Sequence, residues 1–370
     1  MADKYLESCI VNRGNWSRLK ECMRRAKAGQ KLTIANLGGS ITMGSAASRQ
    51  ELCYAYLSHL WWKETFPQAD ITFVNAGIGA TTSQFGVARA DEDVLVYKPD
   101  LVFVEFSVND DNTEHFKETY EGLVRKLYTS GTKPAVVLLH NAFYNDGHSA
   151  EEIHTEIGRY YELPCVSFKN SVMQQVLDGK ITARTLTADD LHPNDLGHSM
   201  LAASVRFFLD QVYAECEEPE EPAVFPEKPV TKNRYETSKR YRSQNLAVSA
   251  CSGFAEDTSV QNHITEIFKN GWTAAEEGAY LECNVEAATL GVQYRRSVAQ
   301  PAPSAKVIVD GDEASAVILN GEFDETWGDL IALQTVFEND TVERHHVRIE
   351  ICNTHQDDVV PFYFVSVITA

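Results

Sequence analysis

The sequence lacks the features that mark membrane, secreted and disulfide-rich proteins. Its N-terminal stretch, MADKYLESCIVNRGNWSRLKECMRRAKAGQ, carries charges throughout and has no apolar core of the signal-peptide kind. No run approaches about 18 consecutive apolar residues, the length of a membrane-spanning helix. The eight cysteines are scattered, without the spacing of zinc sites or redox motifs. We therefore expect a cytoplasmic protein with free, mostly buried thiols and with no metal ion or other cofactor.

Positive charge is also scarce. Only 33 lysines and arginines stand against 53 aspartates and glutamates, and the formal net charge is -20. An excess of negative charge repels phosphate backbones and anionic lipid surfaces, so nucleic acid and membranes are disfavoured as partners. A neutral substrate is compatible with this charge, and so is a homo-oligomer.

The length of 370 residues favours two domains, and the pattern changes near residue 215. Up to that point short apolar runs alternate with longer amphipathic ones. Alternation of strand and helix predicts an α/β domain over 1–215, with a parallel sheet between helices and ligands at the carboxyl ends of its strands. The predicted strands are 31–37, 70–76, 100–106, 135–140 and 164–168, and the predicted helices are 48–66, 115–130, 149–162 and 195–215.

The rest of the chain has a different character. Residues 216–235 are rich in proline and charge, which is typical of a linker. Beyond them, over 236–370, short β-rich segments are separated by glycines and Asp-Gly pairs, and helical patterns are scarce. This pattern predicts a β-sandwich.

Polar residues follow three of the predicted strands. The first strand ends in the GGS stretch at 38–40, the second runs into the small-residue turn 75–83, and the third leads to Asn109. Ahead of the last helix, Asp189 and His192 stand in a D-x-x-H-P arrangement. Because the carboxyl ends of parallel strands share one edge of a sheet, we expect these residues to meet there.

A serine, a histidine and an aspartate can together perform nucleophilic catalysis. The Ser40 hydroxyl is a poor nucleophile unless a base within hydrogen-bond reach accepts its proton, and histidine suits that task. Asp189, three residues before His192, can reach the other ring nitrogen and fix its tautomer. The candidate donors to an oxyanion are the Asn109 amide, the Ser40 N–H and an N–H of the 79–80 turn.

Each of these residues also has a simpler structural explanation. Ser40 could cap a helix or bind phosphate, although no Gly-Lys-Ser/Thr follows it and no G-x-S-x-G elbow is present. Asn109-Asp110 could be a plain turn, and His192-Pro193 could lead into a helix. Asp190 competes with Asp189 as the partner of the histidine. Four polar clusters in fixed order at strand ends nevertheless favour the catalytic interpretation.

The stretches GGSIT, NAGIGATTS, SVND and DLHP, in this order, resemble the four motif blocks of the SGNH hydrolases, also called GDSL-like esterases. The resemblance covers roughly residues 15–215. It implies a flavodoxin-like three-layer α/β/α fold and ester hydrolysis without a metal. It also implies that Ser40 is the nucleophile, His192 the base and Asp189 the orienter of that base.

The sequence departs from the family pattern at two positions. The Asn block opens with Ser107 where the family usually has glycine, and the Gly block has Gly79-Ala80 where a second glycine or Ser-Gly is common. The oxyanion hole implied by the match consists of Ser40, Asn109 and one residue of the 79–80 turn. Gly79 is favoured over Ala80.

An SGNH domain followed by a β-sandwich resembles, more specifically, carbohydrate esterase family seventeen, the acetylated-mannan esterases of gut bacteria. Their C-terminal module binds carbohydrate. The resemblance implies removal of O-acetyl groups from mannan- or xylan-derived oligosaccharides. Trp327, in the acidic stretch GEFDETWGDL, is the expected sugar-binding residue of the β domain, whereas Trp272 and Trp61-Trp62 are expected in the cores.

Two other functions are compatible with the same residues. The first is a lipase or thioesterase of the SGNH type, which would need an apolar groove for its acyl chain. The second is a carbohydrate-binding protein whose hydrolase domain has degenerated. The intact Ser40, Asn109, Asp189 and His192 argue against the second.

Overall fold

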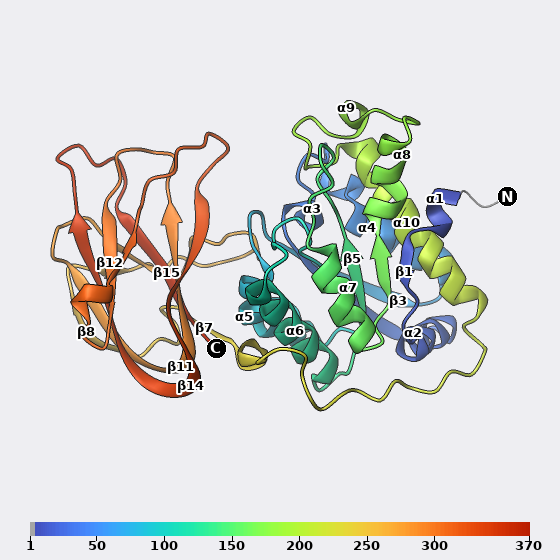
Figure 1. Ribbon diagram of the computed structural model, residues 1–370, viewed down its shortest axis with the longest axis horizontal. Helices are drawn as coiled ribbons and strands as arrows, with labels where there is room; N and C mark the ends of the chain where they lie inside the picture. Colours follow the sequence, from blue (N-terminus) through green and yellow to red (C-terminus); the bar gives the residue numbers. More distant parts are fainter. Residues whose placement is uncertain (1–3) are drawn as a thin grey trace. The chain divides into compact units, whose positions relative to one another are not determined.

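The computed structural model describes residues 4–370, which form two units (Figure 1). The first unit extends to Glu236 and the second begins at Thr237. Each unit has its own apolar core, so they are described separately.

The first unit is built around a six-stranded sheet in the order β1-β6-β5-β4-β2-β3. All strands from β2 onward run parallel, and β1 pairs antiparallel with β6. The chain goes from β2 to β3 on one side and then crosses to β4 on the other, so β2 lies at the switch point where such sheets bind ligands. The strands are β1 (Ile10–Asn12), β2 (Lys31–Gly38), β3 (Asp70–Gly77), β4 (Leu101–Glu105), β5 (Ala135–His140) and β6 (Cys165–Ser167).

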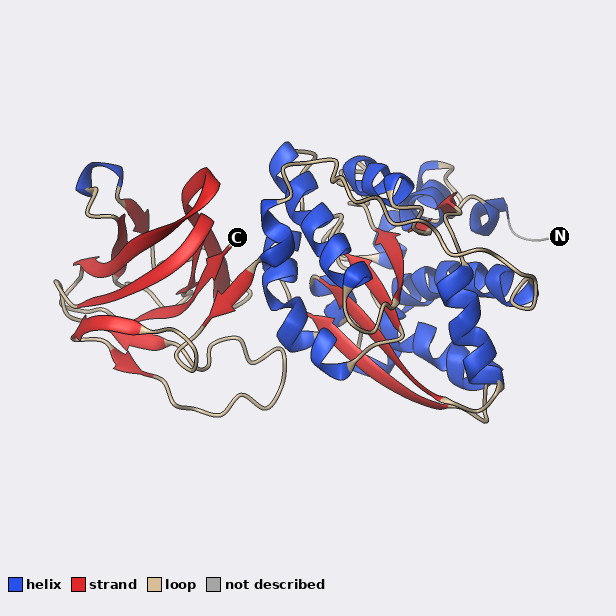
Figure 2. Cartoon of the chain, turned by 90° about the horizontal axis from the view of Figure 1, so that it is seen from below, coloured by secondary structure: helices blue, strands red, loops and turns tan. Residues whose placement is uncertain are grey.

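Helices cover both faces of this sheet, as the alternating pattern predicted (Figures 1 and 2). Helices α5, α6 and α7 pack together on one face, and α2, α4 and α10 pack on the other. The α-helices are α1 (Lys4–Glu7), α2 (Ser17–Lys27), α3 (Ser40–Met43), α4 (Tyr54–Thr65), α5 (Ser83–Asp93), α6 (Glu114–Thr129), α7 (Glu151–Tyr160), α8 (Gln174–Leu177), α9 (Ala183–Leu186) and α10 (Asp195–Ala214). Short helical turns lie at η1 (Gln50–Leu52), η2 (Leu95–Tyr97), η3 (Lys169–Met173) and η4 (Arg234–Thr237).

All five predicted strands of this unit and its four predicted helices are confirmed, but some boundaries differ. The helix expected from residue 48 begins only at Tyr54, because the Cys53 thiol accepts the Tyr56 N–H at 3.5 Å and so caps α4 there. Strand β1 was missed because it has only three half-buried residues. Helix α5 was missed because it is buried on nearly all sides and therefore has no polar face to produce a periodic pattern.

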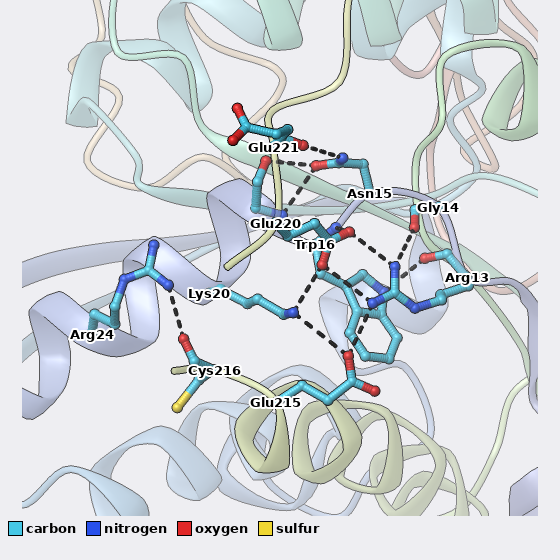
Figure 3. Close-up of polar contacts among 11 residues, drawn as sticks. Arg13, Gly14, Asn15, Trp16, Lys20, Arg24, Glu215, Cys216, Glu220 and Glu221 are labelled. Carbon is cyan, nitrogen blue, oxygen red and sulfur yellow. Dashed lines mark hydrogen bonds and ion pairs between the residues drawn. The ribbon is translucent and has the colours of Figure 1, made fainter. Parts of the chain in front are cut away.

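The stretch after α10 is held along the surface of the first unit by ion pairs (Figure 3). Glu220 and Glu215 pair with Arg13 at 2.9 and 3.0 Å. Glu220 also pairs at 2.9 Å with Lys20, whose side chain is only 2% exposed. The Arg13 guanidinium lies 4.0 Å from the centre of the Trp16 ring. The beginning of this connecting stretch therefore has a defined course.

Further along, the connecting stretch is anchored through an aromatic ring and a buried carboxylate. The ring of Phe225 stacks on Tyr128 and on Tyr161, with 4.8 Å between centroids in both pairs. The wholly buried Glu121 of α6 accepts the backbone N–H groups of Val230 and Thr231 at 2.6 and 2.7 Å. These contacts fix the course of the connecting stretch along α6.

The second unit consists of antiparallel strands. The main path of its sheet is β13-β12-β14-β11-β15-β10-β9, with β7 beside β15 and β8 beside β11. Besides the turn η5 (Glu313–Ser315), its elements are β7 (Lys239–Tyr241), β8 (Val248–Ser252), β9 (Ala255–Glu256), β10 (Trp272–Ala274), β11 (Tyr280–Arg296), β12 (Ser304–Val309), β13 (Val317–Leu319), β14 (Leu330–Asn353) and β15 (Phe362–Thr369).

Two long strands, β11 and β14, connect two layers around the core of this unit. On one edge, β11 pairs with β8 over 280–283 and then with β15 over 290–294, so it leaves one layer and enters the other between these segments. Its pairing with β14 is interrupted by register shifts between 287 and 291, where such irregularities bend strands. The Trp272 ring, 5% exposed, stacks on Phe364 in the core, as predicted.

The cysteines form no disulfide within residues 4–370. Six of the eight are buried, Cys352 is half-buried and Cys251 is exposed, which confirms the prediction of mostly buried free thiols. None of the helices in the described part of the chain is both long enough and apolar enough to cross a membrane.

Candidate active site

The glycine pair before Ser40 is required by close approach of neighbouring groups. A Cβ at Gly38 would overlap the Thr42 hydroxyl, and a Cβ at Gly39 would overlap the side-chain oxygen of Asn109. Gly39 itself has φ -87°, so the pair is not needed for a left-handed turn. Close packing therefore explains the two glycines between β2 and Ser40.

Ser40 lies at the end of β2 and is the first residue of α3. It is 7% exposed. Because an α-helix leaves its first backbone N–H groups without intrahelical partners, the Ser40 N–H is a free donor within α3. The serine thus combines a hydroxyl and a backbone donor at the switch point of the sheet.

Ser40 and His192 are separated by 152 residues in the sequence and are brought into hydrogen-bond contact. The distance from His192 Nε2 to Ser40 Oγ is 2.8 Å, and that from His192 Nδ1 to Asp189 Oδ2 is 2.6 Å. The other Asp189 oxygen accepts the N–H groups of Leu191 and His192 at 3.0 and 2.8 Å. Serine enzymes that catalyse acyl transfer link a serine, a histidine and an aspartate by hydrogen bonds in this way.

The hydrogen bonds to Asp189 stabilise its charged form. Partial burial raises the pKa of this carboxyl, but the bonds from the His192 ring and from the two backbone N–H groups lower it more. The net result is a pKa well below the ordinary value for aspartate. Asp189 is therefore a carboxylate at neutral pH.

Asp190 faces away from the imidazole. Its carboxylate pairs with Arg184 at 2.6 Å, and its carbonyl accepts the Tyr144 N–H at 2.8 Å. Its φ of 65° is left-handed, a conformation that aspartate tolerates better than most residues. This turn leaves Asp189, and not Asp190, in contact with His192.

The 78–82 turn and Asn109 lie beside the serine. The Ile78 N–H donates to the Gly38 carbonyl at 3.1 Å, and a Cβ at Gly79 would lie 3.8 Å from the Ser40 Cβ. Ala80 has a left-handed φ of 55°, which costs a residue with a Cβ about 1 kcal/mol or more. Such local strain is common where backbone groups are held for function.

Comparison with known proteins shows the family to which this chain belongs. Residues 37–200 match the GDSL-like Lipase/Acylhydrolase family. A two-domain esterase active on acetylated mannans is 54% identical, and its structure superposes with a TM-score of 0.95 over 98% of both chains. The same esterase co-crystallized with mannopentaose gives a TM-score of 0.94 over 98% of this chain and 97% of the other. This chain belongs to the GDSL-like lipase/acylhydrolase family.

Two further relatives cover the hydrolase part of the chain. The acetylxylan esterase of Geobacillus stearothermophilus is 28% identical over 168 residues, which is 40% of this chain and 74% of the relative. Thioesterase 1/protease 1/lysophospholipase L1 of Escherichia coli strain K12 is 25% identical over 179 residues, 46% of this chain and 78% of the relative. The GDSL-like protein described here is a carboxylic ester hydrolase.

A buried arginine of this GDSL-like hydrolase supports the turn before Ser40 and was not predicted from the sequence. Arg89 of α5 is fully buried, pairs with Asp93 at 3.0 Å and donates to the Gly38 carbonyl at 3.1 Å. Burial lowers the pKa of its guanidinium. The available signal was an arginine among small and apolar residues in GVARADED, since a buried arginine needs specific acceptors.

Trp327 belongs to the second unit of the GDSL-like hydrolase and lies on the loop between β13 and β14. It is 60% exposed, and its ring contacts Phe323 edge-on, with centroids 5.1 Å apart. The Arg296 guanidinium lies 5.2 Å from the centre of the Phe323 ring. More than half of the Trp327 side chain is therefore open to solvent.

Metal-binding side chains are not clustered in the described part of the GDSL-like hydrolase. Over residues 4–370, no group of three or more His, Cys, Asp or Glu is arranged to hold a metal ion. The paired histidines of β14 have other contacts, because His345 meets Asp310 at 2.7 Å and His346 meets Glu282 at 3.4 Å.

Proposed function

We propose that this hydrolase removes O-acetyl groups from acetylated oligosaccharides derived from mannan or xylan. One observation carries the proposal: the 54% identity to an esterase active on acetylated mannans extends over both units and not over the hydrolase domain alone. The acetylxylan esterase relative supports the same reaction class on a second polysaccharide. A neutral oligosaccharide is also compatible with the strongly negative net charge.

In the proposed reaction, Ser40 Oγ attacks the acetyl carbonyl carbon while His192 Nε2 accepts the hydroxyl proton. Asp189 stabilises the imidazolium that forms. When the tetrahedral intermediate collapses, the bond to the sugar oxygen breaks and the imidazolium protonates that oxygen. Water then attacks the acetyl-serine with His192 again as base, which releases acetate and regenerates Ser40.

The negative charge of each tetrahedral intermediate needs fixed donors. We assign these to the backbone N–H groups of Ser40 and Gly79 and to the side-chain amide of Asn109. The Asn109 side-chain oxygen is buried against Gly39 and has no hydrogen-bond partner among the residues described, which supports the amide nitrogen as the group that faces the substrate.

Trp327 is proposed to bind the sugar part of the substrate. Its exposed ring is suited to stacking on the apolar face of a pyranose, whereas Trp272 is part of the core. The role predicted for Trp327 thus concerns binding energy and not bond breaking.

A series of p-nitrophenyl esters from acetate to octanoate tests the acyl preference. We expect acetate to be the best substrate; a preference for octanoate would instead support the lipase or thioesterase alternative, which the Escherichia coli relative represents. Mass spectrometry of acetylated mannan and xylan oligosaccharides then identifies the natural substrate by loss of acetyl groups.

A Ser40→Ala variant tests the nucleophile in the same assays. We expect kcat to fall by several orders of magnitude, with the protein still folded, because the change removes a reacting atom and little packing. Retention of more than a few per cent of the activity, with contamination excluded, would contradict the serine mechanism.

A further inference from the structure

A buried carboxyl group lies directly beside the proposed oxyanion donor Asn109. Asp110 is the next residue in the turn after β4 and is 1% exposed. The N–H groups of Asn109 and Asp110 both donate to the Phe106 carbonyl, at 3.0 and 2.9 Å. The position of the Asn109 side chain is therefore coupled through one short turn to the position of the Asp110 carboxyl.

The first oxygen of this carboxyl holds the start of helix α5. Asp110 Oδ1 accepts the Ser83 N–H at 2.9 Å, and Ser83 is the first residue of that helix. Thr82, at the N-cap position, makes no side-chain cap of its own. Asp110 thus supplies the cap from a different strand end. The turn that carries Gly79 leads directly into this capped end.

The second oxygen is held by a buried histidine. Asp110 Oδ2 lies 3.1 Å from His154 Nε2, and both side chains are fully buried. The His154 ring stacks on Tyr120 at 3.5 Å between centroids with 8° between planes, so it is fixed by packing. Burial raises the pKa of Asp110 and lowers that of His154, so at neutral pH the histidine is uncharged. Burial of two polar side chains costs free energy unless they are hydrogen-bonded. The bonds to Ser83 and His154 are directional, so they fix the orientation of the Asp110 carboxyl.

We propose that Asp110, oriented by His154, is a positioning residue that fixes the Asn109 amide and the Gly79 turn relative to each other. The inference rests on the proposed role of Asn109 as an oxyanion donor. The carboxyl contacts the capped end of α5 and the turn of Asn109, and His154 prevents its rotation. Loss of the carboxyl would leave both donors present but badly placed at the transition state.

The test is a double-mutant cycle with p-nitrophenyl acetate. Asp110→Ala should lower kcat by about 30-fold or more with KM changed less than about threefold, because a misplaced donor fails mainly at the transition state. Asp110→Asn, which keeps an acceptor for Ser83, should recover kcat to within about fivefold of wild type. In an Asn109→Ala background, Asp110→Ala should lower kcat by a smaller factor, no more than about tenfold, because only the Gly79 donor is then left to be misplaced.

Glu121→Gln is the matched control, since Glu121 is equally buried but serves the connecting stretch. It should lower stability and leave kcat unchanged. If Asp110→Ala lowers kcat by the same factor with and without Asn109, or leaves kcat unchanged, the positioning role is overturned. If Asn109→Ala itself has no effect on kcat, the proposed oxyanion donor fails instead, which is a separate outcome.

A backbone variant keeps the proposal testable if Asp110→Ala does not fold. Ser83→Pro removes the N–H that Asp110 accepts, at a first helical position where proline is well tolerated. It also removes the hydroxyl that contacts Thr119 at 2.6 Å, and Ser83→Ala removes that hydroxyl as well. Thr82 before it is extended, with φ -99° and ψ 173°, as a residue before proline requires. Measured against Ser83→Ala, which keeps that N–H, Ser83→Pro should lower kcat at least about tenfold. Equal kcat values for the two variants would overturn the proposal.

Discussion

At the level of single residues, the two neighbouring aspartates of the DDLH stretch should differ sharply in their effect on catalysis. Asp189 contacts His192 at 2.6 Å, whereas Asp190 pairs with Arg184. Asp189→Asn should therefore lower kcat on p-nitrophenyl acetate by on the order of a thousandfold, because the amide favours the wrong imidazole tautomer. Asp190→Asn should change kcat by less than about threefold, since asparagine also tolerates the left-handed backbone. The reverse order of damage would reassign the orienter.

Gly39 gives a second residue-level prediction. A methyl group there would overlap the Asn109 side-chain oxygen and displace the amide. Gly39→Ala should lower kcat by about a hundredfold, the size of effect seen when an oxyanion donor is lost, and should cost about 1–3 kcal/mol of stability from overpacking. The control is Gly131→Ala, which has no atom within 4 Å of the added methyl. If kcat of Gly39→Ala stays within threefold of wild type, the role of the Asn109 amide as an oxyanion donor is contradicted.

At the level of elements, helix α4 carries a histidine that should weaken the fold in acid. His59 is 5% exposed and stacks on Phe73 at 5.0 Å. Burial lowers its pKa from 6.5 to about 4, so between these values the unfolded chain binds a proton there and the folded chain does not. The contribution of neutral His59 to the free energy of unfolding is fully present above pH 6.5. It is lost as the pH falls from 6.5 toward 4.

The His59→Phe variant isolates this effect, because it keeps an aromatic ring against Phe73 and removes the titration. The wild type should lose about 2 kcal/mol of unfolding free energy through His59 when the pH falls from 8 to 5, and the variant should not. The difference in unfolding free energy, variant minus wild type, should therefore be about 2 kcal/mol larger at pH 5 than at pH 8. Urea unfolding at both pH values measures the difference. An identical difference between the proteins at pH 8 and pH 5 would exclude His59 as the acid-sensitive group.

The connecting stretch gives a prediction about stability alone. Glu121 accepts two backbone N–H groups of the stretch, and Glu121→Gln replaces one of its acceptor oxygens with a donor. We expect a loss of about 1–3 kcal/mol in urea unfolding, because a buried donor loses its partner. The kcat on p-nitrophenyl acetate should remain at the wild-type value, and a parallel fall in kcat would mean that the stretch affects the active site.

At the level of the whole molecule, the second unit should matter for sugars and not for small esters. Trp327→Ala should lower kcat/KM on an acetylated mannooligosaccharide by about tenfold or more, corresponding to about 1–3 kcal/mol for a lost stacking contact. The same variant should hydrolyse p-nitrophenyl acetate normally, because that ester has no sugar to bind. Equal damage to both substrates, or to neither, would exclude Trp327 as a sugar contact.

Trp272→Ala is the comparison for this experiment. Trp272 is in the core and stacks on Phe364, so its truncation should lower stability and affect both substrates in parallel. A substrate-specific loss in Trp327→Ala and a general loss in Trp272→Ala would together separate sugar binding from folding.

The sequence alone was sufficient for the five parallel strands and four of the helices of the first unit, and for the motif blocks of the site. Strands covered on both faces must be apolar throughout, so β4 and β5 stand out as uninterrupted apolar runs. Ser40 and Asn109 stand out for the opposite reason, because they are polar residues that follow buried strands closely. The D-x-x-H stretch stands out by its spacing, which allows the aspartate to reach the histidine ring.

Only the tertiary structure decided which of the competing residues meet. The contact of Asp189, and not Asp190, with His192 depends on a left-handed turn. Gly39 is required by the Asn109 side chain, which lies 70 positions further along the chain. Asp110 and His154 are 44 residues apart and belong to different elements. Sequence patterns report the local periodicity of burial, whereas these contacts depend on how separate elements pack, and so no local pattern contains them.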